Sequence, residues 1–84
     1  MKIKTLVRCE SGDIVTKRAD DKAAAEAAVR ALEAKPFVVG ARLLAVSGGQ
    51  AIINVSTRFG RNEEHSVPKE VADSLISHGY AESA

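Results

Sequence analysis

The chain has 84 residues, which is enough for a single domain, residues 1–84, with one modest core. Its 12 basic and 11 acidic side chains nearly cancel, so bulk charge provides no attraction toward nucleic acid or an anionic membrane. The single cysteine excludes an internal disulfide, and no run approaches the roughly 18 apolar residues of a membrane span. With no leader-like stretch either, we expect a cytoplasmic protein without membrane contact or cofactor.

The first eighteen residues predict a β-hairpin. Residues 2–9 alternate, with Ile3, Thr5, Val7 and Cys9 on one side and the basic residues mainly on the other. Residues 10–13, Glu-Ser-Gly-Asp, form a turn signal, because glycine supplies the positive φ of a tight hairpin. Residues 14–18 begin with β-branched side chains and are expected to be the returning strand.

Residues 19–34 predict the central helix. Asp20 or Asp21 can accept hydrogen bonds from its free N–H groups, and a capping role explains this acidic pair better than catalysis. Glu26 and Arg30 have the favourable order for an ion pair one turn apart. The opposite side is rich in alanine, which lets the helix lie close to a sheet. Pro36 ends the helix.

The next segment predicts a second hairpin, with strands at residues 42–46 and 51–59 around a Ser-Gly-Gly-Gln turn. Alternate residues from Ala51 to Phe59 fall on one face of the second strand. Ile52 breaks that alternation and needs cover from the last helix or from a partner. Residues 60–64 are polar and predict a flexible loop.

A second helix is predicted to open at residues 66–68, where proline is tolerated in the first turn. Gly79 is expected to be the left-handed residue after the helix, with Tyr80 packed back on Leu75. The element order is therefore β-β-α-β-β-α. Its natural solution is an α+β domain with a four-stranded, mainly antiparallel sheet and both helices on one face. The other face is left wet or bound to a partner.

No catalytic or metal-binding constellation is present in the sequence. Cys9 has only the distant His65 and His78 as possible bases, so we interpret it as a buried, inert thiol. Two histidines and one cysteine without short spacing do not predict a zinc site. The Ser-Gly-Gly turn lacks the length and the lysine of a phosphate loop. We therefore expect a protein that is not an enzyme.

A candidate interaction surface follows from the predicted first hairpin. If the hairpin closes on residues 11–12, basic side chains share its outer face with two apolar neighbours, and two arginines near residue 60 add a smaller basic spot. Such a strip can contact phosphates or an acidic partner, but a solvated face with lysines that guard an edge strand is the preferred interpretation. Nucleic-acid-binding sheets usually add stacking aromatics, which are missing here, so nucleic acid is not the expected partner. The residues of this predicted surface are Lys2, Lys4, Leu6, Arg8, Val15, Lys17, Arg58 and Arg61.

The C-terminal segment carries one resemblance. Val67-Pro68-Lys69-Glu70-Val71-Ala72, followed by Leu75-Ile76 and Gly79-Tyr80-Ala81-Glu82, resembles the ending of many small accessory proteins of tailed bacteriophages. It covers about a quarter of the chain, and a well-capped amphipathic helix with a glycine stop has the same pattern.

The resemblance implies a phage-encoded protein that binds other proteins. One role is a virion or assembly component of the head or head–tail type, and the other is an inhibitor of a host defence system of the anti-CRISPR kind. The partner is then a phage structural protein or a host protein, in the host cytoplasm or the virion. A sheet edge could also recruit a second copy by strand addition. A nucleic-acid-binding protein that uses the basic strip is the alternative from another class.

Overall fold

The computed structural model describes residues 1–84 and contains six strands and two helices. All strand pairs are antiparallel and form two three-stranded sheets, a large one with the order β2-β4-β3 and a small one with the order β5-β1-β6. The predicted α+β class is confirmed, whereas the single four-stranded sheet is wrong. The elements are β1 Lys2–Thr5, β2 Cys9–Arg18, α1 Lys22–Glu33, β3 Val38–Ser47, β4 Gln50–Phe59, β5 Glu64–Ser66, α2 Lys69–Ser77 and β6 Ala81–Ser83.

The predicted hairpin turn at residues 11–12 is wrong, because these residues lie inside one continuous strand. β2 pairs with β4 over its whole length, from Cys9 opposite Phe59 to Arg18 opposite Gln50. The chain bends earlier, between β1 and β2, and β1 pairs with β5 and β6 instead. A ten-residue partner strand provides more ladder hydrogen bonds and packing than a local Ser-Gly turn, so tertiary pairing decides the outcome.

The second hairpin is confirmed. Its turn is formed by Gly48 and Gly49, whose φ angles of 59° and 74° lie in the left-handed region that glycine tolerates. β3 is longer than predicted, and its register with β4 shifts twice, between Val38 and Gly40 and between Leu43 and Ala45. Such irregularities are common on edge strands.

Both helices form near their predicted positions. The carboxylate of Asp21 caps α1 by accepting the Ala24 N–H at 2.8 Å, whereas the predicted ion pair between Glu26 and Arg30 does not form. After α2, Gly79 has a φ of 76° and the Tyr80 N–H donates to the Leu75 carbonyl at 2.9 Å, which confirms the predicted glycine stop. The Tyr80 ring is partly exposed and stacks on the His78 ring, so its predicted packing on Leu75 stays a prediction. Neither helix is long and apolar enough to cross a membrane.

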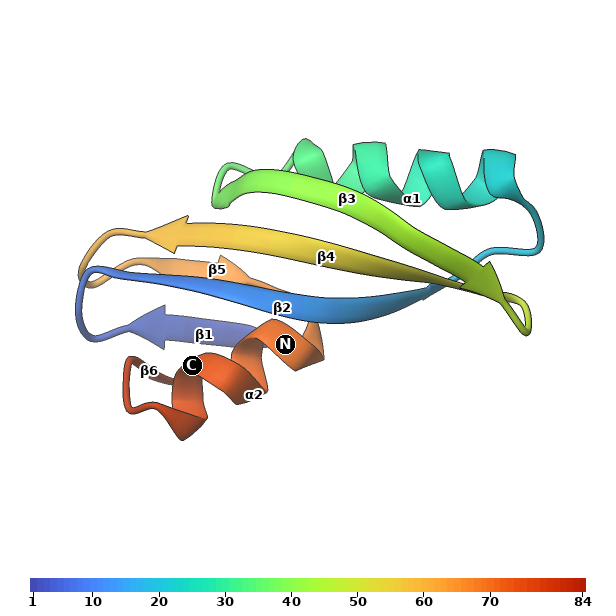
Figure 1. Ribbon diagram of the computed structural model, residues 1–84. Coiled ribbons are helices and arrows are strands. Elements are labelled where there is room, and N and C mark those ends of the chain that lie inside the picture. The colour runs from blue at the N-terminus through green and yellow to red at the C-terminus, as the bar shows by residue number, and fades with distance from the viewer.

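A single core lies on one face of the large sheet. Figure 1 shows α1 along β3 at one border of this sheet, with α2 and the small sheet near β2 at the other border. Both helices contribute buried side chains to that core, as expected. The molecule is elongated, measuring 37 × 20 × 17 Å. The largest fully buried side chains are Phe59, Ile3, Ile53, Leu75, Val15, Val55, Val71, Thr5 and Thr57.

The segment after β4 is predicted to be a flexible loop, and residues 60–63 do form a turn, whereas Glu64 already belongs to β5. The fully buried Thr5 hydroxyl donates to the Gly60 carbonyl at 2.6 Å and accepts the Glu63 N–H at 2.9 Å. The Asn62 N–H also donates to the Thr5 carbonyl, at 3.0 Å. The turn is therefore fastened to β1, and the short strand β5 follows it. The short strand β6 at residues 81–83 was not predicted either.

Candidate functional site

The predicted basic strip does not exist as one surface, because its first hairpin does not form. Lys2 and Lys4 lie on β1, on the outward side of the small sheet. The Lys2 ammonium lies 3.7 Å from the Glu64 carboxylate, and Lys4 is opposite both Glu64 and Glu82 in the strand register. These two lysines therefore have acidic neighbours in the same sheet.

The other members of the predicted surface are dispersed. Val15 is fully buried in the core, so its expected position among the charges is wrong. Lys17 lies at the end of β2 beside a concavity next to α1, and Arg61 is exposed in the turn after β4. Leu6 is partly exposed, and its N–H donates to the Tyr80 carbonyl. Only Arg8 and Arg58 remain close together, at one end of the large sheet.

The large sheet has a second face that neither helix covers, which we call the open face. Strand register and alternation place polar, arginine and a few aliphatic side chains on it, and none of them is buried. Its residues are Glu10, Gly12, Ile14, Thr16 and Arg18 of β2, Gln50, Ile52, Asn54, Ser56 and Arg58 of β4, and Gly40, Arg42, Ala45 and Ser47 of β3.

Aliphatic side chains occupy the middle of the open face. Ile52 lies between Thr16 and Ala45 in the ladder, and Ile14 is one register step away, opposite Asn54. Ile14 is 48% exposed, and Ile52 is not among the partly buried side chains that pack against the core. Ile14, Ala45 and Ile52 form the central apolar patch. The cover that the sequence requires for Ile52 is therefore not supplied by α2.

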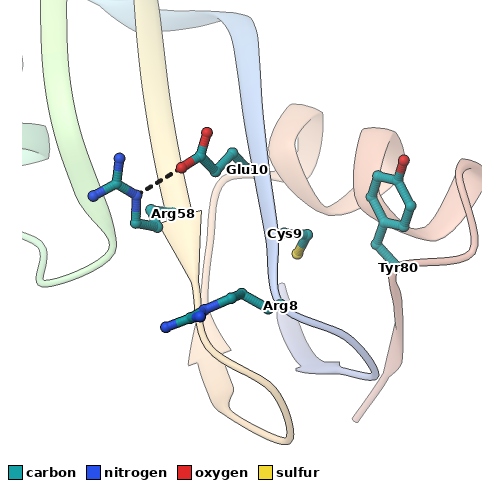
Figure 2. A pocket seen from close by; sticks show the side chains of 5 residues that line it. All are labelled: Arg8, Cys9, Glu10, Arg58 and Tyr80. Carbon is teal, nitrogen blue, oxygen red and sulfur yellow. Dashed lines mark hydrogen bonds and ion pairs between the residues drawn. The ribbon is translucent and has the colours of Figure 1, made fainter.

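One end of the open face is hollowed and basic. Arg8, Cys9, Glu10, Arg58 and Tyr80 line an open concavity of about 630 Å³. Figure 2 shows Arg8 and Arg58 directed to the same side of β2 and β4, away from Tyr80. Arg58 Nε donates to Glu10 Oε1 at 2.8 Å, and Arg8 forms no ion pair. The remaining N–H donors of the two guanidinium groups are therefore free to bind an anionic group of another molecule.

The two borders of the large sheet differ in how their backbone groups are satisfied. At the β2 border, the Thr16 N–H donates to the Glu70 carboxylate of α2 at 3.0 Å. At the β3 border, β3 pairs only with β4, and Val39 and Leu44 are well exposed. The outer edge of this ten-residue strand has no partner and is a template for strand addition. The two register shifts in β3 oppose flat pairing with another strand.

The titratable groups near the core have structural roles. Burial raises the pKa of the Cys9 thiol, and the nearby Glu63 carboxylate raises it further, so Cys9 is a poor nucleophile at neutral pH. The hydrogen bond from His65, at 2.9 Å, and that from the Gly60 N–H lower the pKa of Glu63. The His65 ring packs against the buried Phe37 and Phe59 rings, so this pair fastens the turn to the core.

The chain shows no metal centre, since no three histidine, cysteine or acidic side chains gather. Sequence reasoning had missed Ile14, Arg18 and Arg42 as members of a surface. The assumed turn at residues 11–12 hid the signal, because uninterrupted alternation from Cys9 to Arg18 places Ile14 and Arg18 on the face opposite Cys9 and Val15.

Comparison with protein-family models, with curated proteins and with solved structures found no match. The resemblance of the C-terminal segment to phage accessory proteins therefore stays a prediction.

Proposed function

We propose that this chain is a non-enzymatic protein-binding module that docks through the open face. The observation that carries the proposal is the central apolar patch, Ile14, Ala45 and Ile52, in the middle of an otherwise polar sheet face. Protein interfaces combine an apolar centre with a polar rim, and arginine is enriched in them relative to the remaining surface. The open face has the apolar centre, the polar surroundings and the arginines.

The C-terminal resemblance gives the proposal a biological setting. A phage-encoded module of this kind would be a virion or assembly component, with a head or head–tail protein as its partner. The alternative is an inhibitor of a host defence system, with a host protein as its partner. Both roles need the same property, which is a rigid surface that binds another protein without chemistry.

Nucleic acid is a weaker candidate for the partner. The basic strip required a shared face for Lys4, Arg8 and Lys17, and these residues lie on different parts of the molecule. Phe37 and Phe59 are buried in the core. Tyr80 borders the hollowed end but lies on the other side of β2 from Arg8 and Arg58, so the strands of the open face carry no aromatic side chain on which a base could stack.

The experiment is affinity capture of partners from a bacterial host lysate, with and without nuclease, using tagged wild-type protein and an Ile14→Thr/Ile52→Thr double variant. Threonine retains the β-branched shape and removes most of the apolar surface. We expect a stoichiometric, nuclease-resistant partner that the double variant loses. A host protein would favour the inhibitor role, and particle proteins would favour the assembly role.

A matched control addresses the other exposed surface. Val39→Lys places a charge on the free border of β3, where lysine discourages strand addition. We expect this variant to keep the partner. Loss of the partner from Val39→Lys alone would move the docking surface to the β3 edge, including an edge that pairs with a second copy. Loss of every partner on nuclease treatment would contradict the proposal.

A further inference from the structure

The charges of this nearly neutral chain are unevenly distributed. Four of its six arginines lie at the open face or its hollowed end, together with a single acid, Glu10. Removing these five residues from the 12 basic and 11 acidic side chains leaves eight bases and ten acids elsewhere. The open face is therefore positive on a molecule whose remaining surface is negative. We call Arg8, Arg18, Arg42 and Arg58 the arginine rim.

The arginine rim surrounds the central apolar patch. Arg18 is opposite Gln50 and Arg42 is opposite Asn54, while Arg58 belongs to β4 itself, so the three follow β4 at steps of four residues. Four residues of a strand span about 14 Å. Ile52 lies midway along β4 between Gln50 and Asn54, the residues opposite Arg18 and Arg42. Arg8 adds a fourth cation just before β2. Cations thus occupy both ends and the β3 side of the face.

Most of this charge is available for a partner. Arg8, Arg18 and Arg42 take part in no ion pair, and all three are exposed. Arg58 uses Nε for Glu10, and its terminal amino groups make no hydrogen bond. A guanidinium group can donate two parallel hydrogen bonds to one carboxylate, which makes arginine a specific receptor for acidic side chains.

We infer that the partner of the open face is an acidic protein surface, with aspartate or glutamate carboxylates arranged around an aliphatic centre. This inference rests on the proposed function and specifies its partner. Two observations favour a protein over a phosphate backbone. First, the isoleucines in the middle of the face would not be buried by contact with phosphate groups. Second, lysine commonly binds phosphate, yet all six lysines lie outside the face. Arginine without lysine is typical of protein interfaces.

The test is a selection from a random peptide library displayed on yeast, with the immobilised full chain as bait. We expect enriched peptides that combine aspartate or glutamate with leucine, isoleucine or valine. An enriched peptide should bind at least tenfold more weakly to Arg42→Glu/Arg58→Glu, whereas Lys2→Glu/Lys4→Glu should bind it within about twofold of wild type. Circular dichroism of each variant verifies that it is folded. Both double variants change the net charge equally, so the comparison isolates position from bulk charge.

Three results would overturn the inference. They are enrichment of neutral or basic peptides, no enrichment at all, or tighter binding of a 20-nucleotide oligothymidylate than of any selected peptide. The two proposals can fail separately. A captured partner that needs Ile14 and Ile52 but tolerates Arg42→Glu/Arg58→Glu would retain the protein-binding function and remove the acidic partner. Selected acidic peptides that bind Ile14→Thr/Ile52→Thr normally would retain acidic recognition and remove the central apolar patch as the docking centre.

Discussion

The two borders of the large sheet are built very differently. At the β2 border, α2 buries Val71, Ala72 and Leu75 within nine residues, and its Glu70 satisfies a backbone donor of the edge strand. At the β3 border, α1 buries only Ala25 and Leu32 within twelve residues, and no residue of β3 is buried. Both β2 and β3 are edge strands, but the helix beside β2 buries more of its side chains than the helix beside β3 does.

This difference indicates where the molecule can open at low cost. Local opening is easiest where few apolar contacts hold an element and where backbone groups face solvent. We therefore expect the β2 border to contribute more to the stability of the domain, and the β3 border to open first. Four substitutions test this difference and the attachment of the small sheet.

The largest effect is expected for Leu75→Ala, which removes a fully buried side chain at the β2 border. The free energy of unfolding should fall by about 2–5 kcal/mol, because the lost burial and the remaining cavity both destabilise. Urea denaturation followed by circular dichroism measures this loss, and a parallel shift of the thermal midpoint would support it.

Leu32→Ala provides the matched test on α1, the helix that lies along β3, since it removes the same atoms from that helix. We expect a smaller loss, near the lower end of that range, because the alanine-rich neighbours of Leu32 can close around the gap. Hydrogen exchange should accelerate in α1 and β3 first and leave β4 protected. A loss as large as that of Leu75→Ala would contradict the unequal borders.

An intermediate effect is expected for Thr5→Val, which tests how firmly the small sheet is attached. The change preserves shape but leaves the Gly60 carbonyl and the Glu63 N–H without their hydroxyl partner. Both bonds are partly buried, and leaving such groups unpaired costs about 1–3 kcal/mol. Thr5→Ser retains the hydroxyl and should be less destabilising in the same urea titration. Equal losses for the two variants would show that the methyl group matters and the hydrogen bonds do not.

The smallest effect is expected for Glu70→Gln, which weakens the hydrogen bond between α2 and the edge of β2. Burial raises the pKa of Glu70, but the Thr16 N–H, its own N–H and the Lys17 charge lower it more, so the net shift is downward. The charged carboxylate thus stabilises the fold. Because the group is largely solvated, we expect a loss below about 1 kcal/mol at pH 7.

The pH dependence of this variant gives a sharper readout than its stability at neutral pH. A carboxyl whose folded pKa is lowered adds stability above its unfolded pKa of about 4.3, and that stability is lost as pH falls through the folded pKa. Below about pH 4.5, the urea midpoint of Glu70→Gln should therefore fall less steeply with decreasing pH than the midpoint of the wild type does. Asp73→Asn, on the exposed side of α2, is the control. Identical slopes for Glu70→Gln and wild type would exclude a role for the Glu70 charge.

The elements that depend on interactions between neighbouring residues could be predicted from the sequence. The cap at Asp21, the turn at Gly48 and Gly49, and the stop at Gly79 each depend on a hydrogen bond or a positive φ within a few residues. The alternation of β4 was also readable, because a strand with one buried face repeats every two residues. Neighbouring residues are enough to produce these features, so they can be predicted from the sequence.

Strand pairing depends instead on long-range contacts. A Ser-Gly pair suits a turn and also tolerates a strand, so only the ten-residue partner β4 could make residues 9–18 continuous. That pairing moved Val15 into the core, separated Lys4 from Lys17, and brought Arg42 and Arg58 to the face that carries Ile14. The candidate surface therefore could not be read in advance, because its members come from three strands whose register depends on long-range hydrogen bonds and burial.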